Sequence, residues 1–112
     1  MSDSLKVLGQ LDATATTDEE LYTVPDKSQT TVSSLVICNR SGSGITYRVR
    51  IAVAGASVDN KQYIFYDKAL AANTTEAHVI GITLNQTDVV RVFASSGDVS
   101  FSLFGCETTE ER

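Results

Sequence analysis

The chain has little of what metalloproteins, disulfide-rich proteins and membrane proteins need. Its 112 residues include one histidine, two cysteines, one proline and no tryptophan. One histidine and two separated cysteines cannot make a four-ligand zinc site, and two cysteines do not make a disulfide scaffold. No run approaches the roughly 18 apolar residues of a membrane-spanning helix, and the first residues do not resemble a signal peptide. We therefore expect no metal, no cofactor and no membrane partner, in a chain made in a reducing cytoplasm.

Positive charge is also scarce. Nine Lys and Arg stand against fourteen Asp and Glu, which gives a net charge of −5. Phosphate groups are bound by clustered Lys and Arg, so this balance argues against nucleic acid and against an anionic membrane surface as partners. The length predicts a single domain over residues 1–112, with short polar arms at residues 1–5 and 107–112.

No catalytic motif appears in the sequence. It has no G-x-S-x-G nucleophile elbow, no phosphate-binding P-loop and no G-x-G-x-x-G. His78 is the one histidine that acid–base chemistry could use, and we expect it to be a solvent-facing or capped strand residue. Asp59 and Asp67 lie in predicted connections without the spacing of a calcium loop. Cys38 and Cys106 lie in apolar segments and are expected to be small buried thiols, with a bridge between them left open. We predict that the protein is not an enzyme.

What the chain does have is a two-residue alternation of apolar and polar side chains, clearest over residues 46–53. This period is typical of a strand with one buried face and one wet face. The predicted buried face holds Tyr47, Val49, Ile51 and Val53. Arg48 and Arg50 take the opposite face and are expected to reach solvent or a partner.

Similar extended segments recur along the chain. They cover residues 5–12, 21–24, 30–39, 45–53, 63–66, 75–82, 88–94 and 99–104. Turn residues such as Pro25 and Gly97 separate them at intervals of about ten residues, and Gly81 suggests a bulge. The sequence therefore predicts an all-β fold: an antiparallel β-sandwich, jelly-roll or immunoglobulin-like, of about eight short strands.

One short strand carries more large side chains than a single core needs. Tyr63, Ile64, Phe65 and Tyr66 place large residues on both of its faces. Only one face of a sandwich strand meets the core, so the other must be covered by the chain itself or by another subunit. Tyrosine is common at interfaces because it combines apolar area with a polar tip. We predict that these four residues lie at or beside an oligomer contact, with the terminal arms as further docking candidates.

Several blocks of the sequence resemble, in order and spacing, a family of small tailed-phage virion structural proteins. The blocks are residues 7–10 (VLGQ), 21–25 (LYTVP), 36–40 (VICNR), 61–67 (KQYIFYD), 84–90 and 101–105 (FSLFG). None of them is a catalytic motif. The resemblance implies a non-enzymatic structural component of a virion, in the tail, baseplate or fibre-attachment apparatus, assembled in the host cytoplasm with other virion proteins.

Two other functions remain open at this point. One is a capsid decoration or cement protein on the head surface. The other is a host carbohydrate-binding module, which the lack of tryptophan and the few aromatic residues in loops argue against. By analogy with other small phage modules, a homo-oligomer is expected, with a trimer favoured.

Overall fold

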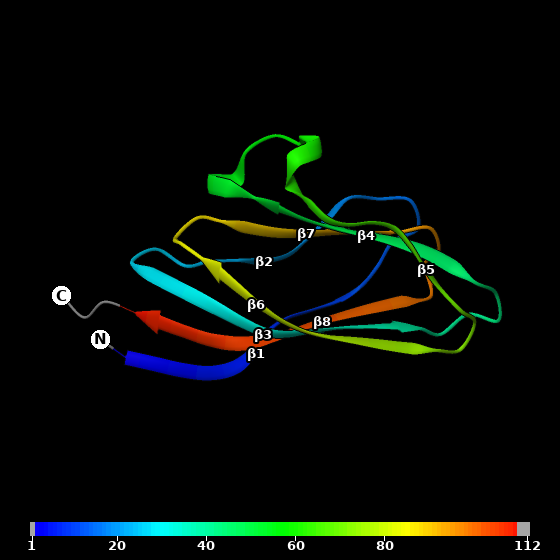
Figure 1. Ribbon diagram of the computed structural model, residues 1–112, viewed down its shortest axis with the longest axis horizontal. Helices are drawn as coiled ribbons and strands as arrows, with labels where there is room; N and C mark the ends of the chain where they lie inside the picture. The colour runs from blue at the N-terminus through cyan, green and yellow to red at the C-terminus, as the bar shows by residue number, and fades with distance from the viewer. Residues whose placement is uncertain (1, 110–112) are drawn as a thin grey trace.

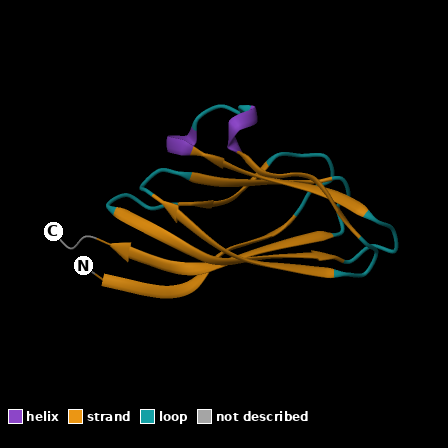
Figure 2. Cartoon of the chain, viewed as in Figure 1, coloured by secondary structure: helices purple, strands orange, loops and turns teal. Residues whose placement is uncertain are grey.

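The computed structural model describes residues 2–109 as two four-stranded antiparallel sheets packed face to face (Figures 1 and 2). The strands are β1 (Ser2–Asp12), β2 (Glu19–Thr23), β3 (Ser28–Asn39), β4 (Ile45–Ala52), β5 (Tyr63–Leu70), β6 (Thr75–Leu84), β7 (Val89–Ala94) and β8 (Val99–Thr109). Two 3-10 turns, η1 (Val53–Gly55) and η2 (Asn60–Gln62), lie between β4 and β5. Within residues 2–109, no helix is long and apolar enough to cross a membrane.

The strand order identifies the sandwich as a jelly roll. The first sheet runs β1-β8-β3-β6 and the second runs β2-β7-β4-β5, so successive strands change sheet at every step except β4 to β5. An immunoglobulin-like sandwich instead keeps several successive strands within one sheet. The predicted all-β sandwich of about eight strands is confirmed, and of its two suggested topologies the jelly roll is the one that forms.

The core lies between the two sheets and is built from alternate residues of their strands. Its largest fully buried side chains include Tyr47, Phe101, Leu35, Ile37 and Leu103. The Tyr47 ring from the second sheet meets the Phe101 ring of the first edge-on, with 6.2 Å between centroids. Burying side chains of this size stabilises the fold by roughly 1.5–3 kcal/mol each, so these alternating positions hold the sheets together.

The facing predicted for β4 is confirmed at Tyr47 and Val49, which are 0% and 1% exposed. The prediction is wrong for Val53, because β4 ends at Ala52 and the chain turns through the positive φ angles of Ala54 and Gly55. Val53 is consequently 64% exposed.

Arg50 also departs from its predicted environment. Its outward direction is as expected, but it is only 6% exposed because neighbouring loops of the same chain cover it. Arg48 on the same face keeps a side chain that is 28% exposed.

The expected terminal arms are largely paired within the subunit. β1 and β8 form one long ladder in which Ser2 lies opposite Thr109 and Leu5 opposite Cys106. Residues 2–5 and 107–109 are therefore sheet residues and not free docking arms, which corrects the expectation for those positions. Met1 and residues 110–112, which the prediction also included, lie outside the described residues.

One glycine is required where β1 approaches the second sheet. The β1–β8 register shifts between Val7 and Gly9, and this bulge turns β1 towards β2. A Cβ atom at Gly9 would lie 2.2 Å from the Leu21 carbonyl oxygen, so a larger residue would push the strands apart.

Candidate functional site

The four predicted contact residues begin β5, an edge strand of the second sheet. Phe65 lies opposite Val49, packs against the core, and stacks on His78 with 4.4 Å between ring centroids. Ile64 and Tyr66 are 43% and 58% exposed. In a single subunit, Ile64 and Tyr66 therefore present large apolar surface to solvent, while Phe65 packs inside its own subunit.

Register shifts in β5 decide which of these side chains share a face. The β4–β5 ladder slips twice, and Asp67, within the first slip, has a φ of 51°. Tyr63 consequently lies opposite Arg50 on the outer face of the sheet, and its ring meets the Tyr66 ring edge-on at 4.9 Å. Strict alternation would instead place Tyr63 on the inner face with Phe65.

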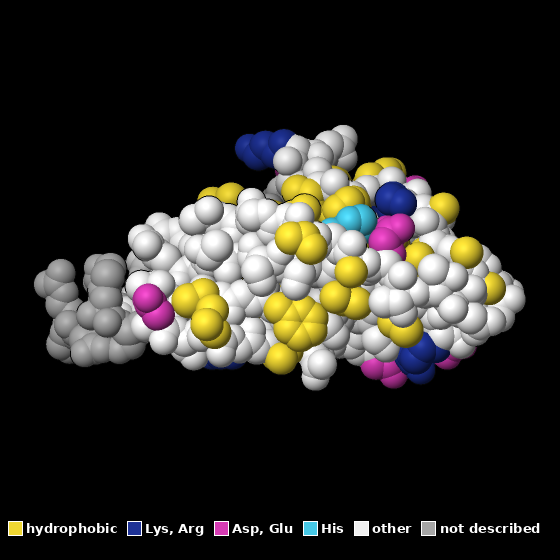
Figure 3. All heavy atoms as spheres, turned by 60° about the horizontal axis from the view of Figure 1, so that its bottom comes forward, with side chains coloured by type: hydrophobic (Ala, Val, Ile, Leu, Met, Phe, Trp, Pro, Cys, Tyr) yellow, Lys and Arg dark blue, Asp and Glu magenta, His cyan; other side chains and the backbone are white. Residues whose placement is uncertain are grey.

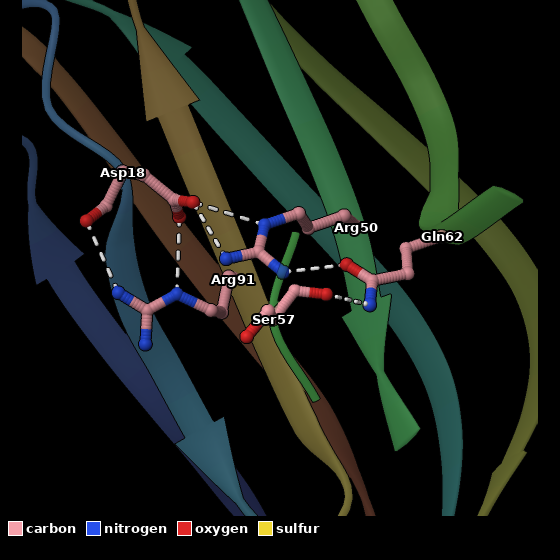
Figure 4. A network of polar contacts seen from close by, with 5 residues as sticks. All are labelled: Asp18, Arg50, Ser57, Gln62 and Arg91. Atoms are coloured by element: carbon pink, nitrogen blue, oxygen red, sulfur yellow. Dashed lines mark hydrogen bonds and ion pairs between the residues drawn. The ribbon is translucent and has the colours of Figure 1, made fainter. Parts of the chain in front are cut away.

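An arginine cluster lies beside these tyrosines on the outer face of β4 and β7 (Figure 4). Arg50 and Arg91 are directly opposite one another, an arrangement in which two positive charges repel. Asp18, from the β1–β2 loop, bridges them. Its Oδ2 accepts hydrogen bonds from Arg50 Nε and Nη2 at 2.9 and 2.7 Å, and its Oδ1 accepts one from Arg91 Nε at 3.1 Å. One carboxylate thus holds two guanidinium groups in place.

Arg50 also fixes the long connection between β4 and β5. Its Nη1 donates to Gln62 Oε1 at 2.6 Å, and Gln62 Nε2 donates to the Ser57 carbonyl oxygen at 2.8 Å (Figure 4). Gln62 is itself 7% exposed. The buried guanidinium therefore ties two loops, one carrying Asp18 and one carrying Gln62, to the same strand.

Arg48 is held between two aromatic rings. Its guanidinium carbon lies 4.4 Å from the centre of the Tyr66 ring and 4.6 Å from that of Phe93. Its Nε donates to Asp67 Oδ1 at 2.7 Å, and this hydrogen bond is the main cause that raises the pKa of Arg48 above its ordinary value. Stacking and ion pairing together leave the guanidinium fixed at the surface.

These groups line an open pocket of about 280 Å³. Its lining residues are Thr16, Asp18, Arg48, Arg50, Val58, Tyr63, Arg91, Val92 and Phe93. Fixed arginine and tyrosine side chains beside apolar surface are the composition of protein–protein contact sites, where Arg and Tyr contribute most to affinity. The pocket lies next to the predicted contact strand, so the two form one candidate interaction region. Sequence reasoning did not find the cluster, because Asp18 is 32 residues from Arg50 along the chain.

The outer face of the first sheet has a different composition (Figure 3). We call it the uncharged face. Its apolar members are Leu5, Val7, Val36, Ala77, Val79, Phe104 and Cys106, and polar members such as Gln10, Thr31, Ser34, Thr83 and Ser102 lie between them. Leu5 and Val79 are 85% and 88% exposed. Figure 3 shows hydrophobic side chains over the middle of this face and charged ones towards its margins.

His78 belongs to a cluster at the open edge between the two sheets. The buried Tyr47 hydroxyl donates to Glu76 Oε1 and lies 2.8 Å from His78 Nε2, which is 2.9 Å from the same carboxylate. The Tyr47 hydrogen bond is the main cause that lowers the pKa of Glu76, and burial raises the pKa of Tyr47. The His78 ring is thus capped within its own subunit, which is one of the two environments expected for it from the sequence.

The two cysteines are separate free thiols on the first sheet. Cys38 lies opposite Ser100 and Cys106 lies opposite Thr31, so the two are in different rows of side chains. Both are partly exposed, which corrects the expectation of buried thiols. Within residues 2–109, no group of three or more His, Cys, Asp and Glu side chains could hold a metal ion.

Comparisons with known proteins give the fold and no family. No family model matches the sequence, and no curated protein matches it. Among solved structures, the chain is similar to one from the structure of infectious bursal disease virus, Gx strain, with a TM-score of 0.53 and 15% identity. The similarity covers 95% of this chain and 32% of the viral chain, so this protein spans under a third of that chain's length. It shows that the jelly roll described above also occurs in a chain of a virus structure.

Proposed function

We propose that the protein is a non-enzymatic structural subunit of a tailed-phage virion. The observation that carries this proposal is a complete eight-stranded jelly roll that leaves the middle of one sheet face uncharged and its Leu5 and Val79 side chains exposed. Jelly rolls are a common architecture of viral capsid domains, and exposed apolar patches mark interaction sites. The likeness to a chain of a virus structure and the resemblance of the sequence blocks to phage virion proteins support the same conclusion.

Within the particle, we place the protein in the tail, baseplate or fibre-attachment apparatus. A decoration protein on the head surface is the second candidate, because a flat uncharged sheet face suits a subunit that lies against a lattice of other proteins. Copy number separates the two. A decoration protein is repeated over the head lattice, whereas tail and baseplate parts are present in far fewer copies.

The subunit is proposed to act as a homo-oligomer, with a trimer favoured and the Tyr63–Tyr66 segment at or beside the contact. The exposure of Ile64 and Tyr66 supports this, as does the rigid setting of Arg48 against the Tyr66 ring. A contact here would bury fixed side chains, which lose little conformational freedom on binding.

Quantitative mass spectrometry of purified particles tests the function. The proposal expects the protein in intact particles at a fixed ratio to the major capsid protein, low for a tail part and close to one for a decoration protein. A protein abundant in infected cells but absent from purified particles would overturn it.

The β5 contact has its own test. Tyr66→Asp should give a folded subunit that assembles poorly, whereas Val53→Asp, at a similarly exposed residue outside β5, should assemble normally. Equal assembly of both variants would remove the β5 contact from the proposal.

A further inference from the structure

The uncharged face is one continuous surface, because its rows of side chains cross all four strands. The rows are Leu5–Cys106–Thr31–Thr83, Val7–Phe104–Ser34–Val79 and Gln10–Ser102–Val36–Ala77. Leu5, Val7 and Val79 are 85%, 47% and 88% exposed in the single subunit. Large aliphatic side chains gathered on one flat sheet face indicate a surface that a partner covers.

Charge is confined to the two ends of this face. Asp3 lies beyond the first row and accepts a hydrogen bond from Thr108 at 2.9 Å. Asp12 and Arg40 lie beyond the last row and pair with each other at 2.5 Å. Within the described strands, no charged residue belongs to the three rows between these ends. In a chain of net charge −5, this is a surface on which two copies can meet without bringing like charges together.

The three uncharged rows set the size of this contact. Four strands at about 4.8 Å spacing give a width of roughly 19 Å, and the six residues from Leu5 to Gln10, at a rise of about 3.3 Å each, give a length of roughly 20 Å. The flat area is then about 380 Å² per copy, or about 760 Å² for two copies, which is the size of a weak contact that repetition in an assembly reinforces. Protruding side chains such as Phe104 add to this flat area.

We propose that the uncharged face packs against the same face of a second copy. Sheets stack about 10 Å apart through their side chains, and a twofold axis in the contact plane pairs one surface with itself. The polar residues among the apolar ones are compatible with such a contact, because interfaces contain roughly as much polar area as ordinary protein surface. This inference rests on one part of the proposed function, namely that the subunit acts in repeated copies. It adds a second contact between copies, separate from the one at β5.

A twofold contact requires an even number of copies. The purified protein should form pairs, or six copies if two β5 trimers stack back to back. Native mass spectrometry and light scattering of the parent protein measure this number directly. The Leu5→Glu/Val79→Glu variant places four carboxylates in each pair's contact and should halve the mass. Val53→Glu is the control, since it adds one of the two carboxylates at a residue that is 64% exposed elsewhere, and it should keep the parent mass.

Two further measurements keep the outcome unambiguous. Circular dichroism of the double variant should match the parent and its thermal unfolding should stay cooperative, because both altered residues are exposed in the single subunit. Alkylation of Cys106, which lies in the first row of the face, should be several-fold faster in the double variant than in the parent.

A parent protein that stays monomeric at high concentration would overturn the contact, as would a double variant that keeps the parent mass. An odd number of copies, unchanged by Leu5→Glu/Val79→Glu and dissociated by Tyr66→Asp, would overturn it while leaving the β5 contact in place. Absence from purified particles would refute the virion function without changing any of these masses, so the two failures can be told apart.

Discussion

Removal of the Asp18 carboxylate is the perturbation for which the structure predicts the sharpest effect on stability. This group accepts two hydrogen bonds from Arg50 and one from Arg91, and it separates two guanidinium groups that lie opposite each other on neighbouring strands. In Asp18→Ala, Arg50 keeps only its hydrogen bond to Gln62. Its side chain is 8% exposed, so water has little access to the donors that lose their acceptor.

The magnitude follows from the burial of the two partners. Leaving a fully buried charge without its partner costs roughly 3–5 kcal/mol. Asp18 itself is 38% exposed, so water can occupy part of the space that its carboxylate leaves, and the cost should fall to about 2 kcal/mol. Asp67→Ala is the matched control, because the Arg48–Asp67 pair is less buried, with side chains that are 28% and 45% exposed, and should contribute at most about 1 kcal/mol.

Urea unfolding of the parent and the two variants measures these free energies. High salt should remove most of the effect of Asp67→Ala and little of that of Asp18→Ala, since buried pairs are screened less. Adding Arg50→Met to Asp18→Ala should recover much of the loss, because it removes the unpaired charge. The reasoning is refuted if Asp18→Ala destabilises no more than Asp67→Ala, or if Arg50→Met in the same background brings no recovery.

Three other predictions concern the core, the pH dependence and the histidine. Val49→Asp should lower the free energy of unfolding by more than about 3 kcal/mol, whereas Val53→Asp should change it by under about 0.5 kcal/mol. Equal effects of the two variants on the urea midpoint would show that Val49 does not face the core. The pKa of Glu76 is lowered mainly by the Tyr47 hydrogen bond, and that of Glu107 is lowered because hydrogen bonds outweigh its burial. A lowered folded-state pKa gives stability that is present above the ordinary glutamate value of 4.5 and is lost as pH falls through the folded-state value. Urea midpoints should therefore decline below pH 4.5. A midpoint that does not depend on pH in this range would contradict the prediction. His78→Ala should leave incorporation into particles and infectivity intact, and normally assembled particles without infectivity would count against a purely structural His78.

The strands were predictable from the sequence because their signal is local. In β4 the side chains of Tyr47 and Val49 alternate with those of Arg48 and Arg50, and this alternation alone assigns the faces. The sheet order was not predictable beyond a sandwich, since pairs such as β1 with β8 join opposite ends of the chain. Nothing in the local pattern of either strand specifies that partner.

The candidate site was predicted in part, and the missing part has a physical cause. The sequence pointed to Tyr63 and Tyr66 by their size, but it did not show the two register slips in β5 that put both on the outer face. The first slip includes a positive φ at Asp67, a residue type that tolerates it without requiring it. The burial of Arg50 depends on Asp18, which reaches it from another loop. Long-range pairs of this kind leave no periodic signal in the sequence.

A three-dimensional reconstruction of the phage particle to which we propose that this protein belongs tests the proposed function most directly. The account predicts an eight-stranded sandwich at symmetry-related positions of the particle, with the uncharged face covered and Leu5 and Val79 out of contact with solvent. A particle whose density contains no such sandwich would contradict the assignment of this chain as a repeated virion subunit.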